Sequence, residues 1–169
     1  TLLICLLLVL ATLAVYWQVR DFGFVMLDDT VYVSGNPRVL YGLSSESVRW
    51  AFWTTYASNW HPLTWISLMA DAQIGRADAA VYHATNVALH IVNTLLLFAF
   101  FSLSTGHRWR AAAVAALFAL HPLHVESVAW VTERKDVLST MFWLLTMLAY
   151  MWYVRRRGIG RYLLVAGMF

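Results

Sequence analysis

Long apolar stretches alternate with shorter polar breaks along this chain. An α-helix needs roughly 20 apolar residues to cross about 30 Å of hydrocarbon, and several stretches approach that length. The candidate spans are residues 2–16, 81–104, 109–125 and 137–154, with residues 162–169 as the beginning of another. The pattern predicts an all-α fold, a polytopic membrane helix bundle with about four complete spans and the start of a fifth.

The whole of residues 1–169 is expected to form one part of a transmembrane domain, the N-terminal part of a longer protein, with no second domain. The longest break, residues 17–80, is too long for a plain turn and should contain structure of its own. Ser44 or Ser45 is a suitable cap for one short helix. Pro62 suits the first turn of a second helix, which Gly75 would end.

Each of these short helices has an apolar stripe at helical spacing. In the first helix the stripe is Val48, Ala51, Phe52 and Thr55. In the second, we expect one face to be buried in the outer leaflet of the membrane. That face consists of Leu63, Trp65, Ile66 and Met69.

Composition supports a membrane protein. Only 12% of the residues are charged and 61% are hydrophobic, whereas soluble domains carry roughly 25% charged residues. The net charge of +3 is small and the arginines stand at the ends of the apolar stretches, so nucleic-acid binding has little support. The single cysteine, Cys5, lies within an apolar stretch and suggests neither a disulfide nor a thiolate metal site.

Charge is distributed unevenly among the breaks. All nine carboxylates fall in residues 17–80 or 121–136, whereas the breaks at 105–110 and 155–161 carry arginine without acid. Short basic loops stay in the cytoplasm. We therefore expect a multi-pass protein of the bacterial inner membrane or the ER membrane, with both acidic segments facing the periplasm or the lumen.

The first candidate site is the adjacent pair Asp28 and Asp29. Apolar residues precede the pair, which should keep it near the membrane surface, where unpaired carboxylates are costly and tend to be functional. The alternative is a solvated pair of loop residues.

The second candidate site lies between the third and fourth stretches. Its polar residues are His124, Glu126, Glu133, Arg134, Lys135 and Asp136. An extended turn after Pro122 could aim both His124 and Glu126 inward. Arg134 and Lys135 are placed to meet a phosphate or lipid headgroups, and Asp136 either takes part in the site or complements the N-terminal end of a helix.

The third group is a polar stripe on the second stretch. His83, Asn86, His90 and Asn93 lie on one helical face. His90 and Asn93 lie deeper and are expected to make hydrogen bonds between helices, whereas His83 and Asn86 could line the site. No spacing here is a tight metal motif, so no cofactor is certain, and a divalent metal held by mixed Asp, Glu and His side chains stays open.

Several strings in this sequence resemble those of a known superfamily. The run Asp28-Asp29-Thr30-Val31-Tyr32 is similar to the D-[DE]-x-x-[YH] signature in the first outer loop of GT-C glycosyltransferases. Longer strings starting at Asn59, His121 and Glu133 are similar to those of the TMTC-like O-mannosyltransferases and the related bacterial membrane proteins that carry tetratricopeptide repeats. This resemblance covers nearly the whole chain.

The resemblance implies an inverting transfer of a sugar, with mannose as the first candidate, from a polyprenyl-phosphate carrier to a hydroxyl acceptor such as a protein serine or threonine. It assigns Asp28 as the catalytic base and Asp29 as its helper in acceptor or metal binding. Asp136 matches the acid that commonly opens the fourth span. The residues expected to bind or orient the substrate are His61, His83, His124, Glu126, Glu133, Arg134, Lys135 and Asp136.

Two other functions remain open. A transporter or flippase could use membrane histidines and outer carboxylates to relay protons, although only His90 lies deep in a span. A non-catalytic membrane anchor for a repeat domain would leave the carboxylate-rich and histidine-rich outer segments without a role.

Overall fold

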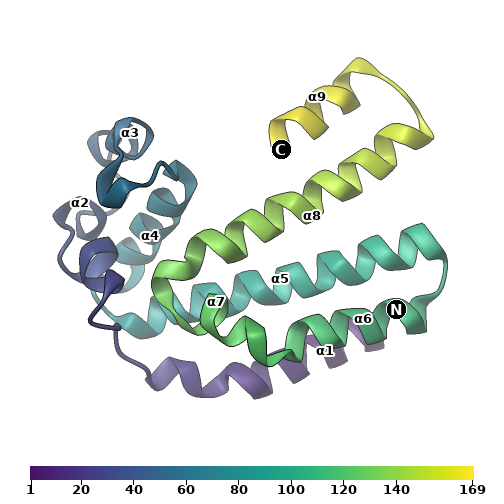
Figure 1. The fold of residues 1–169 in the computed structure, drawn as a ribbon, viewed down its shortest axis with the longest axis horizontal. Helices are drawn as coiled ribbons and strands as arrows, with labels where there is room; N and C mark the ends of the chain where they lie inside the picture. The colour runs from purple at the N-terminus through teal and green to yellow at the C-terminus, as the bar shows by residue number, and fades with distance from the viewer. The chain divides into compact units, whose positions relative to one another are not determined.

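The computed structural model describes residues 1–169 and contains helices and no strand. The helices follow the predicted stretches closely (Figure 1). The long ones are α1 (Leu2–Tyr16), α5 (Ala79–Thr105), α6 (Arg108–Leu120) and α8 (Arg134–Arg155), and α9 (Ile159–Met168) is shorter. The predicted all-α class is confirmed.

Three helical stretches are long and apolar enough to cross a membrane. They are Leu2–Asp21, Ala79–Thr105 and Val131–Arg155. A fourth candidate is the pair formed by α6 and the short helices from Pro122 to Ala129, which are bent by 50° at their junction. The bend has a local cause, because His121 precedes Pro122 and has the extended backbone (ψ 130°) that a residue before proline prefers.

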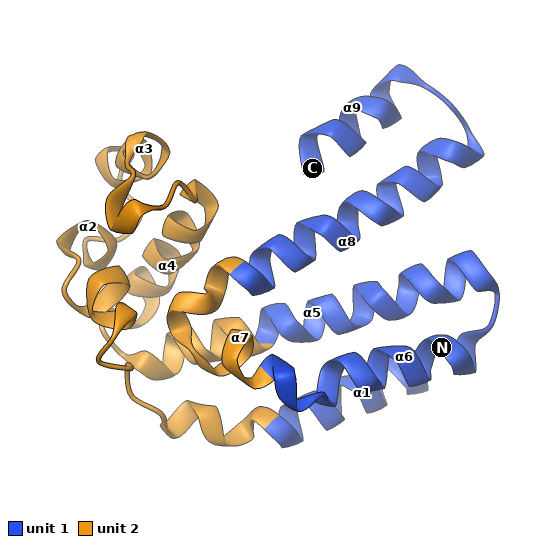
Figure 2. Cartoon of the chain, in the orientation of Figure 1, with its two compact units in different colours: residues 1–15, 88–124, 136–169 blue, residues 16–87, 125–135 orange.

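The chain divides into two compact units (Figure 2). Unit 1 consists of residues 1–15, 88–124 and 136–169, and unit 2 of residues 16–87 and 125–135. In unit 1, Ile4 and Leu8 of α1 pack with Phe98 of α5 and with Ala111 and Ala115 of α6. Small residues on α6 allow this close packing, as is common between membrane helices.

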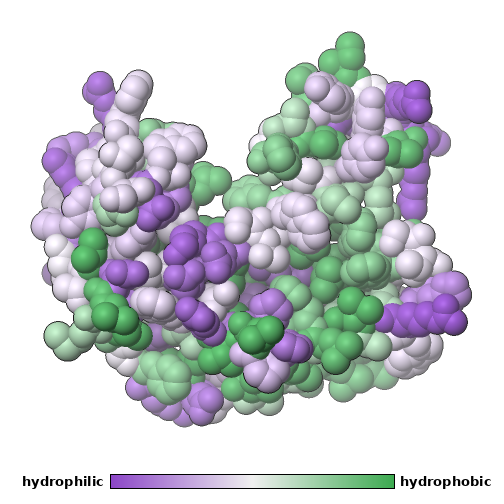
Figure 3. Space-filling model, viewed as in Figure 1, coloured by the Kyte–Doolittle hydropathy of each residue, from purple (hydrophilic) through white to green (hydrophobic).

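Large apolar side chains remain exposed on the long helices, where hydrophobic atoms cover much of the visible face (Figure 3). In α1, for example, Leu2, Leu3, Leu6 and Leu7 are each more than half exposed. Such a surface would be unfavourable in water but suits contact with lipid.

Unit 2 contains the short helices α2 (Pro37–Leu40), α3 (Ser45–Trp53) and α4 (Pro62–Gly75). Local signals set their ends. The Ser44 side chain accepts a hydrogen bond from the Ser47 backbone N–H at 3.0 Å and caps α3, while Pro62 opens α4. Gly75 ends α4 and packs tightly, since a Cβ there would lie 2.5 Å from Cγ2 of Val81.

The core of unit 2 corrects two expectations. Trp65 and Met69 of α4 are fully buried among protein side chains, not in a lipid leaflet. In α3, Ala51 is buried as expected, but Phe52 is 47% exposed and Thr55 lies beyond the end of the helix. Trp65 and Met69, two of the four residues that we assigned to lipid, lie in this unit's core with Tyr32, Val39 and Tyr82. Leu63, another of the four, is 48% exposed.

Candidate active site

The two adjacent carboxylates, Asp28 and Asp29, have different surroundings. Asp29 is fully buried. Its Oδ1 accepts hydrogen bonds from the backbone N–H and the hydroxyl of Thr132, at 2.9 and 2.5 Å, and its Oδ2 accepts one from the backbone N–H of Val25 at 2.8 Å. Asp28 is exposed, and its carboxylate makes no hydrogen bond or ion pair with the rest of the chain. Only Asp28 is therefore available to a substrate.

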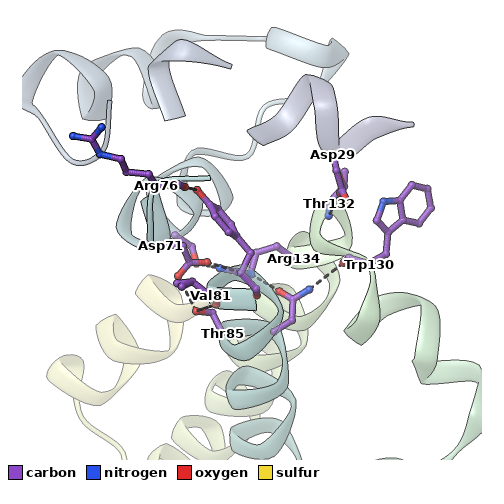
Figure 4. A network of polar contacts seen from close by, with 11 residues as sticks. Asp29, Asp71, Arg76, Val81, Thr85, Trp130, Thr132 and Arg134 are labelled. Atoms are coloured by element: carbon purple, nitrogen blue, oxygen red, sulfur yellow. Dashed lines mark hydrogen bonds and ion pairs between the residues drawn. The ribbon is translucent and has the colours of Figure 1, made fainter. Parts of the chain in front are cut away.

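Thr132 belongs to residues 130–134, which are held from several directions (Figure 4). The side-chain amide of Asn86 donates to the carbonyl of Trp130 at 3.0 Å, and its carbonyl oxygen accepts a hydrogen bond from Nε of Arg134. Asn86 is completely buried, so it does not line an open site as we expected. Its role in this structure is to fix the segment that contacts Asp29.

Arg134 anchors the same segment from within the core of unit 2. Its Nη2 donates to Asp71 Oδ2 at 2.7 Å and to the carbonyl of Tyr82 at 2.8 Å, and its Nη1 donates to Ser67 at 2.7 Å. Arg134 has no exposed surface. The expectation that it meets a phosphate is therefore at odds with the structure, because its guanidinium is enclosed and already bonded.

Asp71 is the partner that the sequence analysis did not single out. It is buried, lies in the ion pair with Arg134 and accepts a hydrogen bond from the Thr85 hydroxyl at 2.7 Å. Burial raises the pKa of the Asp71 carboxyl, while the charge of Arg134 opposes that shift. One signal in the sequence could have identified Asp71, because it is the single acid among the mostly apolar residues of α4. An acid that is buried at such a position usually has a charged partner.

Lys135 and Glu133 form an ion pair of 2.8 Å beside this anchored segment. The Lys135 side chain is 37% exposed, so this residue, unlike Arg134, presents charge at a surface. Its charge also acts on His61. The pKa of His61 is lowered first by burial and then by the positive charge of Lys135, which favours a neutral imidazole at neutral pH.

His61 lies in an aromatic cluster. Its ring centroid is 4.9 Å from that of Trp65 and 5.5 Å from that of Tyr32, whose hydroxyl accepts a hydrogen bond from the Asn59 side chain at 3.1 Å. The Nε2 atom of His61 is buried and has no hydrogen-bond partner. This cluster joins the strings around Asp28 and Asn59 that the resemblance rests on.

His83 is also buried in unit 2. Phe22 meets its ring edge-on, with centroids 6.3 Å apart, and neither ring nitrogen has a side-chain partner. Its surroundings are the backbone near Gly23 and Ala129. His83 therefore lies beside the Asp28–Asp29 loop and residues 125–135, although it is enclosed.

The remaining candidates are His124, Glu126 and Asp136. His124 lies in unit 1, where its ring centroid is 4.5 Å from that of Phe118 and 5.7 Å from that of His90. Glu126 is exposed in the first turn of α7 (Val125–Ala129). The expected extended turn after Pro122 is instead a 3-10 turn that leads into α7, so the backbone does not aim both side chains inward.

Asp136 is exposed in the first turn of α8, a position where a carboxylate also complements the helix dipole. In unit 1, the predicted interhelical bonds are present: Nδ2 of Asn93 donates to the carbonyl of Val137 at 2.8 Å, and Nε2 of His90 lies 3.1 Å from the carbonyl of Ala119.

The sequence leaves a divalent metal open. No group of three or more His, Cys, Asp or Glu side chains lies together in a way that could hold an ion.

Comparison with known proteins gives several similar sequences. The chain is 32% identical over 164 residues to protein O-mannosyl-transferase Tmtc2 of Drosophila melanogaster, a match that covers 92% of this chain. It is 33% identical over 140 residues to TMTC1 of Mus musculus and 32% identical over 113 residues to TMTC2 of Homo sapiens, which cover 76% and 63% of the chain. No family model and no solved structure matches.

These alignments include only a small part of each relative. The chain spans 17% of the Drosophila protein and 14% of each of the two mammalian proteins.

Proposed function

The chain is a distant homologue of the TMTC protein O-mannosyl-transferases over most of its length, and from this premise we propose that it forms the N-terminal membrane part of an inverting GT-C-type glycosyltransferase. The enzyme would move mannose from a polyprenyl-phosphate carrier to a protein serine or threonine hydroxyl. The reaction would take place on the periplasmic or lumenal face.

One observation supports this proposal most strongly: the exposed and unpaired carboxylate of Asp28 is adjacent to Asp29, whose buried carboxylate is held by three hydrogen bonds. Asp29 ties its loop to Thr132, and Arg134 ties the same segment to Asp71 in α4. Asp28 is thus held at the surface by a rigid neighbour while its own oxygens stay available. Catalytic groups need positions fixed in this way.

The proposed chemistry is a direct displacement at the anomeric carbon. Asp28 accepts the proton of the acceptor hydroxyl as that oxygen forms a bond to the anomeric carbon. The bond between the anomeric carbon and the phosphate oxygen breaks at the same time, and its electron pair leaves with the lipid phosphate. The product has inverted stereochemistry, and Asp28 is left protonated.

The leaving phosphate requires nearby positive charge or hydrogen-bond donors. Among the cations near the anchored segment, Lys135 is assigned this role because it is partly exposed, whereas Arg134 is enclosed. His61 is assigned a positioning role, because its unpartnered Nε2 atom is buried and so does not reach the substrate directly. Arg134 and Asp71 act only by positioning residues 130–135.

A transfer assay tests this function. The purified protein in lipid nanodiscs is incubated with radiolabelled polyprenyl-phosphate mannose and a peptide that contains serine and threonine, and the label on the peptide and the anomeric configuration of the product are measured. The proposal predicts a labelled peptide with inverted configuration.

A second preparation of the same protein, in sealed proteoliposomes, distinguishes the alternatives. A transporter or flippase would move the lipid-linked sugar across a sealed proteoliposome without labelling the peptide. A non-catalytic anchor would do neither. Either result would remove the glycosyltransferase proposal for this protein.

A further inference from the structure

One face of helix α3 lines an open groove in unit 2. Glu46, Arg49, Trp50 and Trp53 recur at intervals of three and four residues and therefore lie on one side of the helix. Together with Arg38 from α2 they line a groove with a volume of about 480 Å³. Ala51 is buried in the core of the unit, and Trp50 packs against the same core through Trp65, with ring centroids 5.3 Å apart. Glu46, Arg49 and Trp53 are exposed, so these three side chains form the open side of the groove.

The groove carries a net positive charge. Arg38 is paired with Glu46, and both side chains are largely exposed. Arg49 has no carboxylate partner. One guanidinium charge is therefore uncompensated, and the planar fork of donors on arginine matches the oxygens of a phosphate.

Exposed aromatic side chains surround the end of α3. Trp53 is 83% exposed and Phe52 47% exposed. Trp60 is also mostly exposed and is tied to this end, because its Nε1 donates to the carbonyl of Phe52 at 2.9 Å. Indole rings favour the headgroup level of a bilayer, with the apolar ring toward the acyl chains and the N–H toward water.

We propose that this groove binds the phosphate of an anionic phospholipid and anchors unit 2 to the outer leaflet. Binding of a soluble phosphate would require only the cationic side chains and would leave the exposed aromatic residues without a role. A lipid headgroup also accounts for the apolar aromatic residues at the end of the same helix. The anchoring surface is thus α3 and Trp60, since Trp65 and Met69 of α4 are buried in the core. This proposal does not depend on the transfer reaction.

Photo-crosslinking in nanodiscs tests the lipid site. The full chain is placed in phosphatidylcholine nanodiscs that contain increasing fractions of a diazirine-bearing phosphatidylglycerol, and mass spectrometry measures labelling of residues 45–53. Labelling should saturate. Arg49→Gln should raise the half-saturating fraction about fivefold, the factor expected for one arginine at an anionic surface, and Trp53→Ala should lower the labelling.

Matched variants in unit 1 serve as controls. Arg108→Gln and Trp109→Ala remove an exposed arginine and an exposed tryptophan outside the groove, and labelling of residues 45–53 should not change. Equal labelling by a diazirine-bearing phosphatidylcholine, or an unchanged curve for Arg49→Gln, would overturn the proposal. Loss of labelling in excess inorganic phosphate would also overturn it, since it would indicate a site for soluble phosphate.

Discussion

Asp28 and Asp29 are neighbours in the chain, yet one carboxylate faces solvent and the other is enclosed by three hydrogen bonds. The acidic signature made both residues candidates, and their position near apolar residues could be read from the sequence. Their separate roles could not, because the partner of Asp29 is Thr132, 103 residues away. A contact over that distance leaves no local pattern.

Asp29→Asn tests the enclosed carboxylate. Asparagine keeps one acceptor oxygen but replaces the other with an NH₂ group. That NH₂ group would face either the Val25 N–H or the donors of Thr132, and the donor that it faces would lose its acceptor. We expect the free energy of unfolding to fall by about 1.5–3 kcal/mol, the range for a hydrogen bond to a charged group. Thermal unfolding in detergent measures the change, and Asp21→Asn, at an exposed acid, should leave stability nearly unchanged.

His61 gives a prediction about pH. Burial and Lys135 hold its pKa below 6.5 in the folded protein, so the unfolded chain takes up a proton first as the pH falls. Stability should therefore be full above about pH 6.5 and should decrease as the pH drops toward the folded-state pKa. His61→Gln should flatten this part of the stability curve. An identical pH dependence in wild type and variant would contradict the burial of His61.

At the scale of the elements, local signals in the sequence predicted the ends of α3 and α4 well. Ser44 caps α3, Pro62 opens α4 and Gly75 ends it. The burial of α4 was not predicted correctly, because an apolar stripe looks the same whether lipid or protein covers it. Asp71 distinguishes the two cases only once its partner Arg134 is known.

The buried pair of Asp71 and Arg134 should fix α4 to the start of α8. Arg134→Met leaves the Asp71 carboxylate buried without its ion pair and should lower the free energy of unfolding by about 3–5 kcal/mol. The double variant Asp71→Leu/Arg134→Met removes both charges and should recover part of that loss. Thermal unfolding of the wild type, Asp71→Leu, Arg134→Met and the double variant gives the coupling between the two positions. Additive losses would contradict a direct buried pair.

At the scale of the whole molecule, the positions of the spans followed from the lengths of the apolar stretches, because the bilayer sets the length of a spanning helix. The expected third span coincides with two helices that are bent by 50° at Pro122 and that are long and apolar enough to cross a membrane when taken together. The presence of Pro122 signalled a break, but the size of the bend depends on packing.

The distribution of charge predicts the topology. In a Cys5→Ala background, single cysteines at Ser45 and Leu123, both exposed, should react with a membrane-impermeant reagent added to the outside. A cysteine at Thr105 should react only after the membrane is opened. Labelling of positions 45 and 123 from opposite sides would contradict the placement of the acidic segments on one face.

In the proposed reaction, Asp28 is the base that takes the proton of the acceptor hydroxyl. The most direct measurement is the rate of mannose transfer from polyprenyl phosphate to peptide by Asp28→Asn, with Asp21→Asn as the control for loss of an exposed acid in the same unit. We predict a loss of about 100-fold or more for Asp28→Asn, with normal membrane insertion and thermal stability, and a nearly unchanged rate for Asp21→Asn. A wild-type rate in Asp28→Asn would contradict the account.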